Sequence, residues 1–226
     1  MVLGKDESQT MKKTIQILSA CAAAALLAGC AADTGAESRT TTYVAHLQPL
    51  NTAVTGGQTT GEARLVQRGN ELDVDIRVQG APAGIVHWQH FHGFEDGSPA
   101  SCPGAAADAN GDGIVDLLET EPSSGTTMVP FISAPQSMDI PGGTYPTADA
   151  AGAYDYQATI PLDALQAAFN KSFPDQQLDL DRRVIFIHGV PESTALPASV
   201  QSLGPIPAQT TLPIACGVIE LASIRQ

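Results

Sequence analysis

Apolar and β-branched residues recur along this chain in short runs, and many of these runs alternate with polar residues. Alternation with a period of two places every second side chain on the same face of a β-strand, so such runs predict half-buried strands. Clusters of glycine, proline and other turn-forming residues separate the runs. The pattern predicts strands at residues 41–47, 61–66, 71–78, 85–91, 153–160, 184–188 and 213–221.

Two stretches depart from this pattern. Residues 161–173 carry apolar side chains at Leu162, Leu165, Ala168 and Phe169, which is the spacing of a short amphipathic helix. Residues 120–152 are rich in proline, glycine and serine and are interpreted as a long irregular connection. Seven or eight strands with one short helix in a loop predict an all-β fold, a Greek-key β-sandwich or barrel.

The N-terminus has the pattern of a bacterial lipoprotein signal. Met11-Lys12-Lys13 forms a short basic region, and the apolar residues 15–27 are too few to span a bilayer as a stable helix. Leu27-Ala28-Gly29-Cys30 then resembles a lipobox, which is cut just before its cysteine. The alternative is an ordinary secretory signal followed by a coincidental cysteine.

We therefore predict a lipoprotein signal peptide at residues 1–29, with residues 1–10 upstream of the true start. The mature chain would begin at an acylated Cys30, and the small polar residues of 30–41 would form a tether. Lipid on Cys30 would make the bilayer a partner and place the protein in a bacterial cell envelope. Ala31, rather than aspartate, follows the cysteine, which favours the outer membrane.

Length and composition narrow the classes of function for the predicted mature domain, residues 42–226. A chain of this length suits a single domain with one sizeable core. The formal net charge of the whole chain is -13 and its few basic residues are scattered, so nucleic acid is not an expected partner. Few aromatic residues and many glycines and prolines suit an all-β domain with many turns.

The histidines are candidate metal ligands. In the segment His87-Trp-Gln-His-Phe-His92, His90 and His92 lie two apart, so they project from the same face of a strand and can share one metal. His87 would lie on the opposite face. With His188, which ends another apolar run, they offer three imidazoles that suit copper, and zinc nearly as well. The structural alternative is that these histidines cap turns or hydrogen-bond to the backbone.

A resemblance to the copper/zinc superoxide dismutases spans roughly residues 41–225 and rests on four short motifs in the correct order. They are the His-x-x-His-x-His segment, Cys102, the run ending at His188, and Ala215-Cys-Gly-Val-Ile219. The resemblance implies that family's sandwich, copper ligands and disulfide, with His90, His92 and His188 as ligands, His87 in support, and Cys102 paired with Cys216. The cysteine count agrees, because Cys21 leaves with the signal and Cys30 carries lipid, although two free buried thiols are the alternative.

The chain departs from that family at several functional positions. No histidine lies between His92 and His188, where the family has its bridging histidine and its zinc ligands, so no zinc site is expected. Pro213 stands where the family has an arginine that guides the anion, so steering of superoxide should be weak. The fourth copper position would be filled by water, by a remote side chain such as His46, or by nothing.

A second resemblance covers the first half of the chain. Tyr43-Val-Ala-His-Leu47 and Thr60-Gly-Glu-Ala63 resemble the CHRD domains, which share this style of β-sandwich. The strand at residues 215–219 distinguishes the two families and favours the dismutases.

Residues 108–119 match the calcium loop of EF-hands. Side-chain oxygens occur at positions one, three, five, nine and twelve, a glycine permits the turn at position six, and position seven offers a carbonyl. The ligand positions are Asp108, Asn110, Asp112, Ile114, Asp116 and Glu119. Pro103-Gly104 before it and Pro122 after it leave little room for flanking helices, so we expect an isolated loop with millimolar-range affinity. The alternative is a solvated turn.

These features predict a copper-binding, superoxide-dismutase-like envelope lipoprotein that cycles Cu(II) and Cu(I), with calcium as a second cofactor. The competing class is a non-enzymatic protein on the same fold, which either buffers and delivers copper or uses a calcium-stabilised surface to bind a partner. A structural domain whose histidines only satisfy hydrogen bonds is the third alternative.

Overall fold

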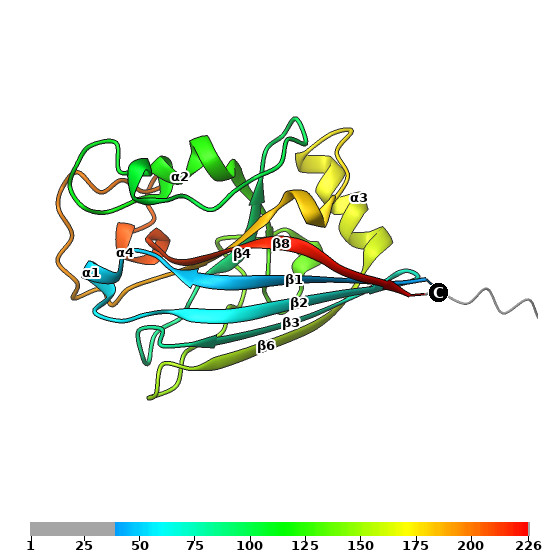
Figure 1. Ribbon diagram of the computed structural model, residues 1–226, viewed down its shortest axis with the longest axis horizontal. Helices are drawn as coiled ribbons and strands as arrows, with labels where there is room; N and C mark the ends of the chain where they lie inside the picture. The colour runs from blue at the N-terminus through cyan, green and yellow to red at the C-terminus, as the bar shows by residue number, and fades with distance from the viewer. Residues whose placement is uncertain (1–38, 226) are drawn as a thin grey trace, which may run out of the picture. The chain divides into compact units, whose positions relative to one another are not determined.

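The computed structural model describes residues 39–225. The predicted signal peptide, the acylated Cys30 and most of the predicted tether therefore lie outside the described residues. Within them the fold is all-β, as predicted: eight antiparallel strands form one curled sheet in the order β5-β4-β7-β8-β1-β2-β3-β6. Figure 1 shows β8, β1, β2, β3 and β6 of this sheet side by side. Neighbours that are not consecutive in the chain, such as β4 with β7, mark crossover connections rather than a simple meander.

The strands are β1 (Thr40–Pro49), β2 (Thr60–Arg68), β3 (Glu71–Gln79), β4 (Gln89–Gly93), β5 (Thr126–Pro130), β6 (Tyr154–Pro161), β7 (Val184–His188) and β8 (Pro213–Arg225). The helices are α1 (Thr52–Thr55), α2 (Leu117–Ser124), α3 (Leu162–Ser172) and α4 (Ala208–Thr211), with 3-10 turns η1 (Ala105–Ala107), η2 (Pro135–Ser137) and η3 (Leu180–Arg182). No helix among residues 39–225 is long and apolar enough to cross a membrane.

The structure corrects three of the predicted boundaries. β1 begins at Thr40, inside the range predicted as a tether, because Thr40 pairs with both Arg68 and Arg225. β4 begins at Gln89 rather than at residue 85, because Val86 pairs with Thr147 outside the named strands. The stretch 120–152, predicted to be irregular, contains the end of α2 and the whole of β5.

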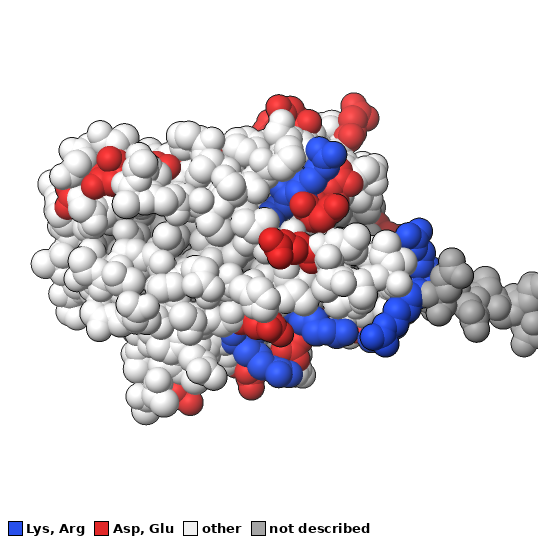
Figure 2. Space-filling view, in the orientation of Figure 1, with Lys and Arg blue, Asp and Glu red and all other residues white. Residues whose placement is uncertain are grey.

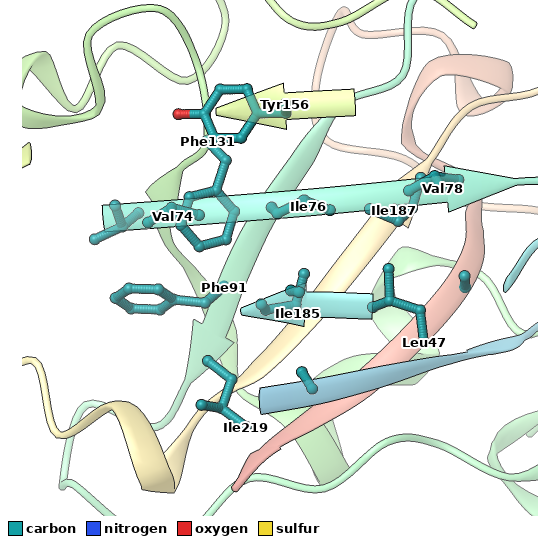
Figure 3. Packing of buried hydrophobic residues seen from close by; sticks show 14 of the residues in the cluster. Leu47, Val74, Ile76, Val78, Phe91, Phe131, Tyr156, Ile185, Ile187 and Ile219 are labelled. Atoms are coloured by element: carbon teal, nitrogen blue, oxygen red, sulfur yellow. The ribbon is translucent and has the colours of Figure 1, made fainter. Parts of the chain in front are cut away.

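Strand β8 connects the two halves of the sheet. Its first part pairs with β7, from Pro213 opposite His188 to Val218 opposite Val184, and most of it pairs with β1. The sheet therefore curls so that β3 faces β4 and β7 across the core. Figure 3 shows Val74, Ile76 and Val78 of β3 with Phe91, Ile185 and Ile187, and all six side chains are at most 2% exposed.

The short helix predicted at residues 161–173 is confirmed as α3, which follows β6 directly. Its Leu165 and Phe169 are fully buried, and Phe169 lies 6.4 Å from Phe91 between ring centroids. The helix thus covers the core with the face that its sequence spacing predicts.

Two long segments, residues 94–125 and 189–212, connect β4 to β5 and β7 to β8, and the first packs on the outer side of β7 and β8 through Ala100 and Cys102. We call them the covering layer. A disulfide between Cys102 and Cys216 ties the first segment to β8, with Cα atoms 5.8 Å apart, which confirms the predicted pairing. The second segment is closed at its base, where it joins β7 and β8, since Gly189 N–H donates to the carbonyl of Leu212 at 3.0 Å.

We expect Phe169→Ala to lower the free energy of unfolding by about 3 to 5 kcal/mol, because truncation leaves a cavity beneath α3 that its aromatic neighbours cannot fill. Equilibrium urea unfolding measures this change. Lys171→Ala, on the exposed side of the same helix, is the control and should change stability by less than about 0.5 kcal/mol. Equal effects of the two substitutions would contradict the packing described for α3.

Candidate metal centre

Three histidines meet on the outer side of β4 and β7. Along β4, His90 and His92 alternate with Phe91, which enters the main core. Along β7, Ile185 and Ile187 enter that core, so Phe186 and His188 face outward. Because His90 is opposite Phe186 in the β4–β7 pairing, the outward side chains of the two strands come together.

Their potential ligand atoms converge. One nitrogen from each of His90, His92 and His188 lies within 4.8 Å of the other two, and no other such group of three occurs among residues 39–225. His92 Nε2 is 3.1 Å from His90 Nδ1, and the ring centroids of His90 and His188 are 4.6 Å apart. The structure therefore brings together the three histidines that the sequence predicts, in an arrangement that can bind a metal ion.

The cluster is closed to solvent. The exposed fractions of His90, His92 and His188 are 3%, 1% and 1%. The ring of Phe186 lies 4.7 Å from that of His92 and 5.6 Å from that of His188, between centroids. Phe186 also pairs with Cys216 across the β7–β8 ladder, so the disulfide holds the covering layer beside the histidines.

Burial keeps these imidazoles neutral. Desolvation lowers the pKa of His92 to about 3 and the pKa of His188 to about 4, and it lowers the pKa of His90 well below its ordinary value. The charge that His188 would carry lowers the pKa values of His90 and His92 further. Backbone carbonyls act in the opposite direction, that of Thr211 on His188 and that of Gly125 on His92. A neutral imidazole has a free lone pair, which is the form that binds a metal.

Two of the ring nitrogens have no hydrogen-bond partner. His188 Nδ1 lies 2.7 Å from the carbonyl oxygen of Thr211, to which it donates, while the buried His188 Nε2 contacts no donor or acceptor. His92 Nδ1 is also buried without a partner, since the nearby Gly125 carbonyl does not meet hydrogen-bond geometry. Buried polar atoms are seldom left unpaired, so the free Nε2 of His188 fits a metal ligand.

His87 lies behind the cluster rather than in it. Its Nδ1 is 3.0 Å from the carbonyl oxygen of His188, and its Nε2 is 2.9 Å from that of Pro82. The ring stacks on Tyr154 with centroids 5.8 Å apart. These contacts fix the backbone at the end of β7.

The structure does not bring His46 to the cluster. Its side chain is 67% exposed, and Nδ1 lies 3.6 Å from a carboxylate oxygen of Glu62 on the neighbouring strand. Ala45 and Leu47, on either side of it, are buried, so His46 points out of the opposite face of β1. It is therefore not placed to be the fourth ligand.

Arg182 and Arg183, which lie close to His188 in sequence, are bonded to loop carbonyls rather than to the cluster. Arg183 is buried but donates to the carbonyls of Leu178, Phe94 and Gln177, while Arg182 donates to that of Gly97. The covering layer contains no lysine or arginine at all. On the face shown in Figure 2, the end that carries α1 and α4 has acidic but no basic side chains. This charge distribution attracts cations and gives anions no steering.

In the predicted calcium loop, the carboxylates bind backbone amides. Asp108 accepts from the N–H groups of Gly111, Asp112 and Gly113. Glu119 accepts from those of Ala109, Asn110 and Asp116. No three acidic residues of this loop each bring a carboxylate oxygen within 4.8 Å of the other two, so calcium binding would require these side chains to turn.

The last residues of this loop begin a helix, α2, that the sequence analysis did not predict. Asp116 is the N-cap of α2, and its side chain accepts from Leu118 N–H and Glu119 N–H. With the reciprocal bond from Asp116 N–H to Glu119, this is a capping box. The Asp-x-x-Glu spacing could have revealed the helix, but the same residues also fit the calcium pattern.

The chain was compared with known protein families and with curated proteins, and no match was found.

The metal-free protein should lose stability as the pH falls from about 6.5 towards about 4. In this range the unfolded chain protonates its histidines while buried His188, with its lowered pKa, stays neutral, so the unfolded state binds more protons. His188→Asn removes one such group, and its amide can still donate to Thr211. The pH dependence should then be shallower by up to about 1.4 kcal/mol per pH unit, measured by urea unfolding with a chelator present.

His46→Asn is the matched control for this experiment, because that histidine is exposed and lies outside the cluster. Parallel curves for the wild type and His188→Asn between pH 6.5 and 4 would contradict the burial of a neutral imidazole.

Proposed function

We propose that this protein binds one copper ion through His90, His92 and His188. The observation that carries the proposal is the unpaired, buried Nε2 of His188 beside two further imidazole nitrogens that face each other at 3.1 Å. Three neutral imidazoles suit copper in either oxidation state, and zinc nearly as well. We choose copper because the motifs around these residues resemble those of the copper/zinc superoxide dismutases, whose zinc ligands this chain lacks.

The surrounding groups support this role by fixing the orientation of the ligands. The Thr211 carbonyl accepts from His188 Nδ1, which leaves the proton off Nε2 and directs that lone pair into the cluster. His87 contacts the His188 carbonyl from the other side of the sheet. The ligands are thus held in place before a metal arrives, which reduces the ordering cost of binding.

We further propose that the protein is a superoxide-dismutase-like enzyme that dismutates superoxide at this site. Bound copper would supply one-electron cycling between Cu(II) and Cu(I), oxidising one superoxide to dioxygen and reducing the next, with two protons, to hydrogen peroxide. The contribution of the chain is to hold three imidazoles around the centre and to exclude bulk water with Phe186 and the covering layer.

A second candidate is copper buffering or delivery without turnover. The observation that favours it is the combination of a closed cluster with a covering layer that has no basic residue. Such a site attracts a copper ion but gives superoxide, an anion, no electrostatic guidance. In this case the fold would hold copper rather than expose it to a substrate.

For the location, we propose attachment to the outer membrane of a bacterial envelope through lipid on Cys30. The lipobox at residues 27–30 and Ala31 support this assignment. Copper and calcium ions and the bilayer would then be its partners, and the net charge of -13 argues against nucleic acid.

The wild-type protein, produced as the soluble form that begins after Cys30 and supplied with copper, should contain about one copper per chain by mass spectrometry. His90→Ala/His92→Ala should contain none, because a single remaining imidazole cannot hold the ion against a chelator wash. The exposed His46→Ala is the matched control and should keep its copper.

A superoxide assay on the same samples separates the two candidates. Dismutation by the copper-loaded wild type that disappears in the double variant would establish the enzyme. One copper per chain with a dismutation rate equal to that of buffer would establish the second candidate, copper buffering or delivery. Copper retained in the double variant would contradict both candidates, because both require the histidine site.

For the loop at 108–119 we propose calcium binding that stabilises the covering layer. Two of its carboxylates already contact the segment 189–212: Asp112 accepts from the Ser199 hydroxyl at 2.5 Å, and Asp116 accepts from Gln201 N–H at 2.7 Å. Calcium held by these carboxylates would therefore order both parts of the covering layer. The twelve-residue spacing supports this proposal, which requires Asp108, Asp112 and Glu119 to turn from backbone amides towards the ion.

Calcium at about ten times its dissociation constant should raise the free energy of unfolding by about 1.4 kcal/mol, measured by thermal or urea unfolding. Asp108→Asn/Glu119→Gln should abolish this gain, whereas Asp155→Asn, on the exposed face of β6, should keep it. An equal gain in all three proteins, or in magnesium at the same concentration, would assign the effect to general ionic screening instead.

A further inference from the structure

We propose that Thr127 is a positioning residue of the metal centre. Its hydroxyl would form a hydrogen bond to the water or small anion that occupies the coordination position left by the three histidines. This inference rests on the proposed copper site and extends it, since no residue of that site has been assigned to the incoming ligand. It follows from the register of β5, from a contact to His92, and from the chemistry of an imidazole that binds a metal.

A β-bulge places Thr127 at the cluster. Phe91 is opposite Val129, so a regular ladder would put Met128 opposite His92; the register shifts between Phe91 and His92, and Thr127 takes that place instead. Met128 and Val129 are both fully buried in the main core. The extra residue thus turns Thr127 to the outer side of the sheet, where His92 lies.

The hydroxyl meets the nitrogen that would bind the metal. Thr127 Oγ1 is 3.0 Å from His92 Nε2, and the same Nε2 is 3.1 Å from His90 Nδ1. No other side-chain hydroxyl among residues 39–225 forms a hydrogen bond to a ring nitrogen of the three clustered histidines. Thr127 is half-buried, whereas the three imidazoles are at most 3% exposed, so it is the more accessible partner in this contact.

Metal binding would change the partner of this hydroxyl. A neutral imidazole has a ring lone pair only on the nitrogen without a proton, and in the tautomer that leaves this lone pair on His92 Nε2, Thr127 donates to it in the metal-free protein. When a metal takes that lone pair, the hydroxyl loses its acceptor while remaining beside the centre. The acceptor that then becomes available is an exogenous ligand on the metal, because three imidazoles leave a position open in a four-coordinate site.

Thr127→Val tests this role, since it keeps the size and branching of the side chain and removes only the hydroxyl; Thr127→Ser, which keeps the hydroxyl, is the matched control. Azide is the probe, and its affinity for the copper-loaded proteins is measured from the optical titration of Cu(II), with copper content determined in parallel. We expect all three proteins to hold about one copper. Azide affinity should fall about two- to tenfold in Thr127→Val and stay within about twofold of wild type in Thr127→Ser.

The outcomes separate this inference from the copper proposal. Equal azide affinities in three copper-loaded proteins would overturn the role of Thr127 and leave the copper site standing. Loss of copper from Thr127→Val alone would also overturn it, because the hydroxyl would then serve metal retention. A wild type that takes up no copper would overturn both proposals.

Discussion

The antiparallel pairing of β4 with β7 is the constraint on which the rest of this structure depends. Because side chains alternate along a strand, burying Phe91, Ile185 and Ile187 in the main core forces the intervening residues to the other face. Those residues include all three clustered histidines. The packing that stabilises the fold and the geometry of the candidate centre are therefore two consequences of one register. A shift of one residue in this pairing would move the apolar side chains to the outer face and the histidines into the core.

An outward-facing cluster is buried only because another layer covers it. The disulfide between Cys102 and Cys216 ties residues 94–125 to β8, and cross-linking so distant a pair restricts the unfolded chain strongly, by about 4 to 5 kcal/mol on the chain-entropy view. The cover removes water from the imidazoles, keeps them neutral and leaves two ring nitrogens unpaired. Each unpaired buried group costs about 1 to 3 kcal/mol, so the metal-free centre is a local weakness that a bound ion would offset.

The candidate calcium loop and the helix cap share the same residues. Asp116 and Glu119 satisfy the calcium pattern and also the capping box of α2, and the cap is what the structure contains. Through Asp116 and Asp112 the loop contacts residues 199–201, close in sequence to Ser202, whose hydroxyl lies 2.8 Å from that of Thr211. Thr211 in turn accepts from His188. A contiguous set of contacts thus connects the loop to the centre.

The sequence alone determined seven of the eight strands, the amphipathic α3 and the shared face of His90 and His92, because these depend on local periods of two and 3.6 residues, whereas β5 was missed. Resemblance of short motifs added His188 and the disulfide, which periodicity cannot reach across such distances in the chain. Only the tertiary structure decided that His46 points away, that Arg182 and Arg183 bind loop carbonyls, and that Thr127 faces His92. These outcomes depend on which strands become neighbours and on a single bulge in β5, and no local pattern encodes either.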